Sequence, residues 1–220
     1  MSAVSPEEVC GEARSEVFTV GHSTLPYEAF LELLRIAGVT AVADVRSTPF
    51  SRHFPHFNRD PLKSRLATDA VAYVFLGKEL GGRPQTSNLF YDGVADYERM
   101  ATTDSFNDGL RRVLDGSKQF RIALMCSERN PLDCHRCLLV GRALSERGTD
   151  VRHIMGNGTI EPHDRVEQAL LNMAEKHHDD FFMSAELRLA EAYRERSMKV
   201  AFADNVDFTE PLIKERDFRE

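Results

Sequence analysis

The amino-acid sequence predicts an α/β protein whose mostly parallel, doubly wound sheet of about five strands carries helices on both faces. Three observations indicate this fold. Short β-branched, apolar segments alternate along the chain with segments whose apolar residues recur at helical spacing. The segment 39–45 is apolar on both faces, as expected of a strand buried between two helical layers. Runs of polar residues directly follow the apolar segments, where an open parallel sheet binds its ligands.

The first half of the chain contains three of the predicted strands. Residues 17–20 form a β-prone run that stops at Gly21, and apolar residues at helical spacing then extend from Pro26 to Gly38. Residues 39–45 form the second strand. A polar, proline-containing loop and a short helix over residues 62–67 precede the third strand, residues 71–76. A glycine-rich turn covers residues 77–82.

The second half completes the sheet and then changes character. Helices are expected over residues 97–100 and 106–114, the fourth strand over 120–126, a helix over 136–147 and the fifth strand over 151–154. Gly148 is placed to cap the helix before that strand. From residue 161 the chain is charged and contains two amphipathic patterns, around residues 166–173 and 187–193.

This pattern divides the chain into three parts. We expect residues 1–14 to be a flexible leader, residues 15–158 to form the α/β core domain, and residues 159–220 to form a helical extension. The extension is expected to pack on the core or to form an interface in a homo-oligomer.

Composition limits the classes of function. The chain has 220 residues and a formal net charge of −7, which argues against an overall electrostatic grip on nucleic acid. No apolar run reaches the roughly 18 residues of a membrane span, and residues 1–14 do not read as a secretory signal. The sequence therefore predicts a cytoplasmic protein that does not bind membranes. Three of its four cysteines are crowded between positions 126 and 137, which favours reduced thiols or a metal site over structural disulfides.

The cysteine-rich run 126–137 follows a strand and opens a helix, so it is the first candidate for chemistry. Cys134 is expected near a helix N-terminus, where the helix dipole and Arg136 lower a thiol pKa. Cys126 and Cys137 fit equally well as buried small hydrophobes. Cys134 and Cys137 have the spacing of a redox pair. A metal site built from Cys126, Cys134, Cys137 and a histidine is a further alternative, although its spacing matches no common zinc motif.

Other candidates lie at the neighbouring strand ends. His22 and Glu128 are candidates for acid/base catalysis, and Arg46 beside Asp44 could hold an anion or brace its loop. Lys78 and Glu79 are expected to form an ion pair that could also exchange protons. The remaining candidates for substrate binding are Ser23, Ser51, His135 and Arg136.

One loop is both basic and aromatic. Arg52, His53, His56 and Arg59 alternate there with phenylalanines, a composition that can stack on and neutralise a nucleotide or a single nucleic-acid strand. A mobile lid or an ordinary surface loop has the same composition.

Taken together, these motifs resemble the prokaryotic family catalogued as domain of unknown function 488. The resemblance covers roughly residues 18–154, with the motifs in order. It implies the α/β fold and an intracellular location, and it implies no reaction. Cys137 departs from the family pattern, which puts a redox pair with Cys134 in doubt for the group, and Ser127 stands where alanine is more usual. The matching positions are His22, Ser23, Asp44, Arg46, Pro49, Ser51, Gly77, Lys78, Glu79, Leu80, Gly81, Gly82, Cys126, Glu128, Pro131, Cys134, His135 and Arg136.

The preferred interpretation is an enzyme for a small anionic or nucleotide-like substrate, with no cofactor identified. Cys134 or Cys126 is its thiolate, His22 and Glu128 its acid/base groups, and Arg46 and Arg136 its anion clamps. One alternative is a nucleotide or nucleic-acid module that uses the loop from Arg52 to Arg59. Others are a thiol redox or metal-binding protein and a structural protein that assembles through residues 161–220.

Overall fold

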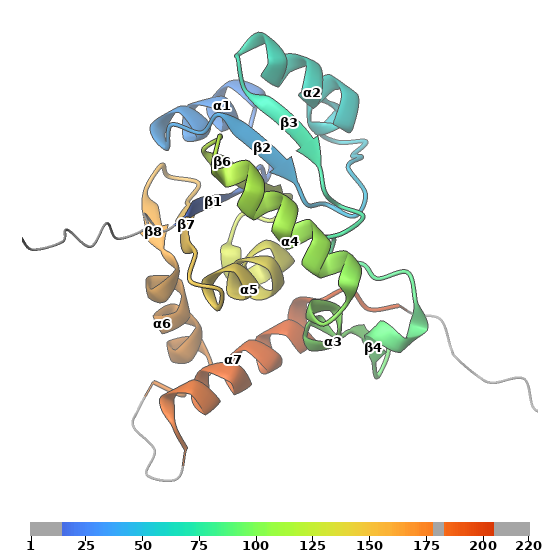
Figure 1. Ribbon diagram of the computed structural model, residues 1–220, viewed down its shortest axis with the longest axis vertical. Helices are drawn as coiled ribbons and strands as arrows, with labels where there is room; N and C mark the ends of the chain where they lie inside the picture. The colour runs from blue at the N-terminus through green and yellow to red at the C-terminus, as the bar shows by residue number, and fades with distance from the viewer. Residues whose placement is uncertain (1–14, 178–182, 205–220) are drawn as a thin grey trace, which may run out of the picture.

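The structure is a computed structural model of the chain, and it describes residues 15–177 and 183–204. Its centre is a six-stranded sheet with the order β3-β2-β6-β1-β7-β8 (Figure 1). Five strands run parallel, and β8 pairs antiparallel with β7 at one edge. The strands are β1 (Glu16–Gly21), β2 (Ala41–Asp44), β3 (Ala72–Phe75), β6 (Ile122–Cys126), β7 (Asp150–Ile154) and β8 (Ile160–Pro162).

The predicted α/β class is confirmed, and the five expected strands are the five parallel ones. The second strand is shorter than expected, because the ladder begins at Ala41 and ends at Asp44. The sequence did not predict β8, nor the small hairpin of β4 (Phe90–Tyr91) and β5 (Val94–Ala95). These strands of two or three residues are too short to show a period of two.

Helices cover both faces of the sheet (Figure 1). Each face has its own apolar core. One core includes Phe18, Val42 and Met125 and is closed by α1 (Tyr27–Ile36) and α2 (Arg59–Thr68). The other includes Val17 and Leu124. It is closed by α4 (Asp104–Ser117), the helix that follows β6, and α6 (His163–Met173). Side chains alternate between the two faces along each strand, which is why the expected strands are apolar on both sides.

The helix expected over residues 136–147 has an unusual start. Its first part, η4 (Arg136–Gly141), is a π-helix, and only α5 (Arg142–Ser145) is α-helical. The N–H of Arg142 donates to the carbonyl of Cys137, five residues earlier. Wide turns of this kind are rare and are frequently found at functional sites. The other η elements are 3₁₀ turns: η1 (Pro55–Phe57), η2 (Ser87–Leu89) and η3 (Pro131–Asp133).

Capping side chains fix where two helices begin: α3 (Tyr97–Ala101) starts at Tyr97, as predicted, whereas α4 starts at Asp104, two residues before its apolar pattern. Asp96 accepts hydrogen bonds from the N–H groups of Glu98 and Arg99 at the start of α3. Thr103 does the same for the N–H of Phe106 in α4. These caps satisfy donors that a helix start otherwise leaves unpaired.

The expected C-terminal helices are α6 and α7 (Ala185–Val200), which pack against each other. The chain then returns to the core, where Ala203 forms a bridge with Val94 of the β4–β5 hairpin. Among the helices that the structure describes, none is both long and apolar enough to span a membrane. Residues 1–14 and the segments 178–182 and 205–220 of the predicted extension lie outside the described residues.

Candidate active site

A pocket of about 330 Å³ opens at the carboxyl ends of the strands. It forms there because β2 and β6 are neighbours in the sheet, so the loops that follow them diverge from adjacent points. The pocket is called the strand-end pocket below. It is lined by Arg46, Ser47, Thr48, Phe50, Gly82, Arg83, Tyr97, Cys126, Ser127, Glu128, Asp133, Cys134, His135, Val200 and Phe202.

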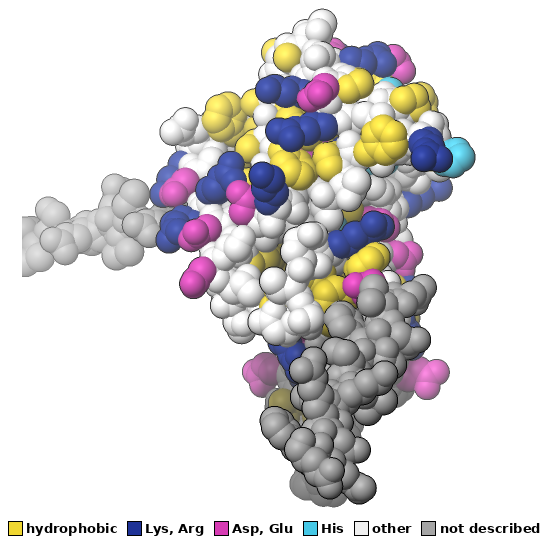
Figure 2. All heavy atoms as spheres, turned by 90° about the vertical axis from the view of Figure 1, so that its right-hand side faces the viewer, with side chains coloured by type: hydrophobic (Ala, Val, Ile, Leu, Met, Phe, Trp, Pro, Cys, Tyr) yellow, Lys and Arg dark blue, Asp and Glu magenta, His cyan; other side chains and the backbone are white. Residues whose placement is uncertain are grey.

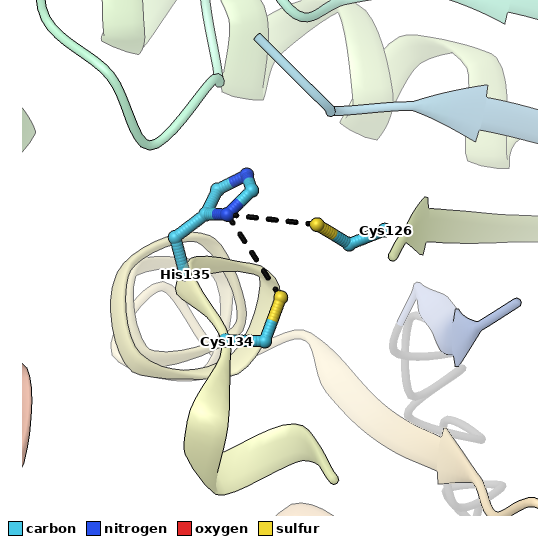
Figure 3. Close-up of side chains that lie close together, drawn as sticks. All are labelled: Cys126, Cys134 and His135. Carbon is cyan, nitrogen blue, oxygen red and sulfur yellow. Dashed lines mark hydrogen bonds between the residues drawn. The ribbon is translucent and has the colours of Figure 1, made fainter. Parts of the chain in front are cut away.

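Four reactive side chains meet at this pocket: Cys126, Cys134, His135 and Glu128, here called the thiol cluster. Cys126 ends β6, and Cys134 follows η3. Both sulfurs lie 2.9 Å from Oε2 of Glu128. Nδ1 of His135 faces both, 3.7 Å from Sγ of Cys126 and 3.8 Å from Sγ of Cys134 (Figure 3). The structure thus brings together residues that are separated by up to nine positions.

A backbone contact on the side of the ring away from the thiols fixes the orientation of His135. Its Nε2 lies 2.9 Å from the carbonyl oxygen of Val45, which can only accept, so Nε2 carries a proton. Nδ1 is then the nitrogen that exchanges protons with the thiols. Gly82 packs against this ring, and a Cβ at position 82 would lie 2.8 Å from Cγ of His135. Any larger residue there would displace the imidazole.

The environment separates the pKa values of the two thiols. Burial alone would raise the pKa of Cys134, but the hydrogen bond from Cys126 and the charges of Arg136 and His135 lower it well below its ordinary value. Burial and the neighbouring Cys134 raise the pKa of Cys126. Cys134 is therefore the thiol that ionises first.

The two other members of the cluster respond to that thiolate. Burial lowers the pKa of His135, but the negative charge on Cys134 outweighs it and raises the pKa above its ordinary value. Burial and Cys134 also raise the pKa of Glu128, although the residue as a whole is solvent-exposed. The cluster can thus hold a thiolate beside a protonated imidazole.

Arg46 reaches the pocket wall, and other residues hold its guanidinium firmly. Nε and Nη2 donate to the two carboxylate oxygens of Asp44 at 2.9 and 2.6 Å, and Nη2 also donates to the carbonyl of Phe57 at 2.8 Å. Tyr73 donates to the same carboxylate at 2.7 Å. The predicted pairing of Asp44 with Arg46 is therefore present, and it is buried.

His22 lies behind Arg46 and does not line the pocket. Its Nε2 accepts from Nη1 of Arg46 at 3.2 Å, while Nδ1 lies 2.9 Å from the carbonyl oxygen of Ser23. Its ring stacks on Phe57 at a centroid distance of 4.1 Å. Burial and the charge of Arg46 lower the pKa of His22 to about 4. In this position it orients Arg46 as a neutral imidazole.

Arg136 binds backbone and is not part of the pocket lining. It is only 1% exposed, and its two terminal nitrogens donate to the carbonyls of Glu128 and Arg129 at 2.6 and 3.0 Å. Its backbone N–H points at Sγ of Cys134 at 3.4 Å. Arg136 therefore braces the loop that carries Glu128 and places a positive charge near the thiolate.

The other predicted binding residues lie outside the pocket lining. Ser23 adopts a φ of 48° and hydrogen-bonds through its N–H to the carbonyl of Ser127. Ser51 helps to form its own loop, since its hydroxyl accepts from the N–H of Phe54. Lys78 is exposed.

One expected contact at this edge was wrong. Glu79 forms its ion pair with Arg112 of α4 and not with Lys78, because α4 packs beside the turn that carries both residues.

The structure separates Cys137 from Cys126 and Cys134. Cys137 is buried in η4 and faces His153, whose Nε2 is 4.0 Å from its sulfur. A metal site containing all three cysteines was therefore the wrong grouping. Two smaller groups could each hold an ion, with donor atoms within 4.8 Å of one another: Cys126, Cys134 and His135 form one, and Cys137, His153 and His163 form the other.

The basic and aromatic loop is only partly a surface feature. Arg52 and His53 are exposed, but Phe57 is buried against His22, and His56 lies 3.0 Å from the carbonyl oxygen of Leu25. Arg59 stacks over the ring of Phe75. On the face drawn in Figure 2, lysine and arginine side chains lie among apolar ones over the upper part of the molecule.

Several pocket residues were missed as site residues. Phe50 is 63% exposed at the pocket, a conspicuous position for an aromatic side chain in a polar loop. Tyr97 starts one of the predicted helices but was assigned no role in the site. No feature of the sequence connected Arg83, Val200 or Phe202 with the site. Val200 and Phe202 lie more than 60 residues after Cys134 and outside the predicted amphipathic patterns.

The family model described as domain of unknown function DUF488 matches residues 26–143. The chain belongs to this family, as its motifs indicated. No match was found among the curated proteins or among the solved structures.

Proposed function

We propose that the protein is an enzyme that acts on a small anionic substrate in the strand-end pocket, with Cys134 as its nucleophile. The observation that supports this most directly is the thiol cluster itself. Two thiols, an imidazole and a carboxylate converge on one wall of a cavity with room for a small molecule. Such a set of perturbed groups in a cleft is typical of active sites.

The roles follow from the hydrogen bonds. Cys134 is the thiolate, stabilised by Cys126 and by the N–H and charge of Arg136. Its sulfur forms a bond to an electrophilic centre of the substrate while the bond to the leaving group breaks. Protonated His135 delivers its Nδ1 proton to that leaving group, and water afterwards releases the group held on sulfur.

The arginines at the pocket differ in whether they are paired, and an arginine outside any ion pair favours an anionic substrate. The carboxylate of Asp133 is neutralised by Arg196, and Asp44 neutralises Arg46 in part. Arg83 is exposed, lies over the ring of Phe202 at 4.8 Å, and forms no ion pair with the residues that the structure describes. Its guanidinium is therefore available to a carboxylate or phosphate.

Alkylation kinetics test this function. Metal-free full-length protein is treated with iodoacetamide between pH 5 and 9, and each cysteine is followed by mass spectrometry. We expect Cys134 to react with an apparent pKa well below the ordinary thiol value, and Cys126→Ala to raise that pKa because its hydrogen bond is lost.

Cys137→Ser is the matched control, because Cys137 is a buried thiol that does not line the pocket. It is expected to leave the rate at Cys134 unchanged. If Cys134 of folded, metal-free protein reacts only at the pH of an ordinary thiol, the nucleophile is wrongly assigned.

A further inference from the structure

A second group of metal-binding side chains lies inside the molecule, away from the strand-end pocket. Cys137 of η4, His153 of β7 and His163 of α6 are buried, with 0%, 1% and 4% of their surface exposed. They are called the histidine cluster. Sγ of Cys137, Nε2 of His153 and Nδ1 of His163 lie within 4.8 Å of one another. None of the three lines the strand-end pocket.

Both imidazoles are held from their outer sides. Nδ1 of His153 lies 2.8 Å from the hydroxyl of Thr19, and Nε2 of His163 lies 3.0 Å from the hydroxyl of Tyr193. Tyr193 in turn donates to Glu167 at 2.9 Å. Outer hydrogen bonds of this kind orient histidines that ligate metals and fix the ring nitrogen that faces the ion.

The inner nitrogens of the two rings contact each other. Nε2 of His153 and Nδ1 of His163 are 2.9 Å apart, so a single proton must lie between them. The sulfur of Cys137 lies 4.0 Å from the same Nε2. An ion placed among these three atoms would replace that shared proton.

We propose that the histidine cluster is a binding site for one soft monovalent cation, Cu(I). Two imidazole nitrogens and a thiolate are donors that a soft cation prefers. The cluster offers three donors, whereas a structural Zn²⁺ site has four.

Charge also favours a monovalent ion. Cu(I) with one thiolate and two neutral imidazoles is neutral overall, which suits a buried site. Zn²⁺ with the same ligands would leave one positive charge, and the guanidinium of Arg136 is buried next to Cys137 in the chain. The carboxylate of Glu167 lies on the outer side of His163, 3.5 Å from Nε2, where it is partly exposed to solvent. The positive charge of Arg136 acts on both Cys137 and His153.

The protons balance on binding. The proton between the imidazoles moves to Nδ1 of His153, and the resulting N–H donates a hydrogen bond to the hydroxyl oxygen of Thr19. Cys137 releases its proton to solvent, and copper stays Cu(I), so no oxidant or reductant is needed. His163 borders a surface cleft of about 470 Å³ that also includes Thr149 and Asp164, and this cleft provides a route for the ion.

The test isolates Cys137 from the other thiols. The triple variant Cys10→Ser, Cys126→Ser, Cys134→Ser keeps Cys137 as the last thiol of the full-length chain. It is titrated with Cu(I) without oxygen, in competition with a coloured Cu(I) chelator. We expect one equivalent of bound copper and an X-ray absorption spectrum with one sulfur and two nitrogen ligands.

Two further variants locate the site. Adding Cys137→Ser to the triple variant, or adding His163→Gln instead, is expected to lower the bound copper at least tenfold. Circular dichroism identifies variants that remain folded, and the His163 variant serves as the test if the Cys137 variant unfolds. The proposal is overturned if the folded triple variant binds no copper, or if either addition leaves copper binding unchanged.

Discussion

His22, Asp44 and Arg46 show at the scale of single residues what a sequence does and does not reveal. Their types and their places at strand ends were predictable, because parallel strands present their carboxyl ends at one edge. Their orientation was not, because it depends on Phe57 and Tyr73 from distant positions. His22 is directed at Arg46 instead of the pocket, and Arg46 is anchored by Asp44 before any ligand arrives.

The buried carboxylate of Asp44 leads to a prediction about stability. Asp44→Ala leaves Arg46 without its charge partner at a site where only 5% of that side chain is exposed. Losing one partner of a buried pair costs about 3–5 kcal/mol. Urea unfolding should show a loss of this size.

Asp108→Ala is the matched control, since Asp108 pairs with Arg111 on the exposed side of α4. We expect that change to cost at most about 1 kcal/mol. Equal losses for the two variants would contradict a structural role for the Asp44–Arg46 pair.

At the scale of elements, the end of α7 and the chain that follows it are part of the pocket. Val200 and Phe202 line it, and the carbonyl of Phe202 accepts from the N–H of Ala95 in β5. Arg196 of α7 donates to the carbonyl of Leu132 in the loop before Cys134. The sequence placed this segment on the core or at an oligomer interface but gave no reason to connect it with the thiols.

Phe202→Ala should therefore open the pocket while leaving every charged side chain of its lining in place. We expect iodoacetamide to modify Cys134 several-fold faster at every pH, because a wall of the pocket is removed. The apparent pKa of Cys134 should stay the same, since Cys126, His135 and Arg136 are untouched. The measurement is the full profile of alkylation rate against pH.

Phe120→Ala provides the comparison, because Phe120 is a solvent-accessible phenylalanine, 42% exposed, that does not line the strand-end pocket. Its profile should match that of the unmodified protein. A Phe202 variant with unchanged rates would show that this side chain does not limit access to Cys134.

At the scale of the whole molecule, the fold was more predictable than the site. Alternating strands and helices specify a parallel sheet with covered faces, and turn signals at Gly38 and Gly148 mark the ends of two helices, with φ values of 62° and 83°. The strands β4, β5 and β8 were missed because their patterns are short. The convergence of Cys126, Cys134 and His135 was foreseen as a region, whereas the separate grouping of Cys137 with two histidines depends on β7 and α6 packing together.

The buried His22 makes the stability of the molecule depend on pH. Its pKa falls from 6.5 to about 4 on folding, so between these values the unfolded chain binds a proton that the folded chain does not. The stabilisation is present above pH 6.5 and is lost as the pH falls toward 4. In His22→Asn, the free energy of unfolding should therefore rise less steeply with pH over this range. The slope should be smaller than that of the unmodified protein by up to about 1.4 kcal/mol per pH unit.

This is measured by urea unfolding at several pH values between 4 and 7. His53→Asn removes an exposed histidine and should retain the pH dependence of the unmodified protein. If the His22 variant follows the same curve as the unmodified protein, His22 is not neutral and buried in the folded state.

The π-helix η4 has one more consequence, which concerns deletions and evolution. Its wide turn contains one residue more than an α-helix of the same length would need. Removing a residue from 138–141 could restore regular winding, but it would rotate Cys134 and His135 by about 100° relative to α5. The angle between these two residues and α5 around the helix axis changes by a full step with each residue inserted or deleted, so small changes in this angle are not available to evolution. Among functional descendants of this chain, we expect length changes in the surrounding loops but not in this turn.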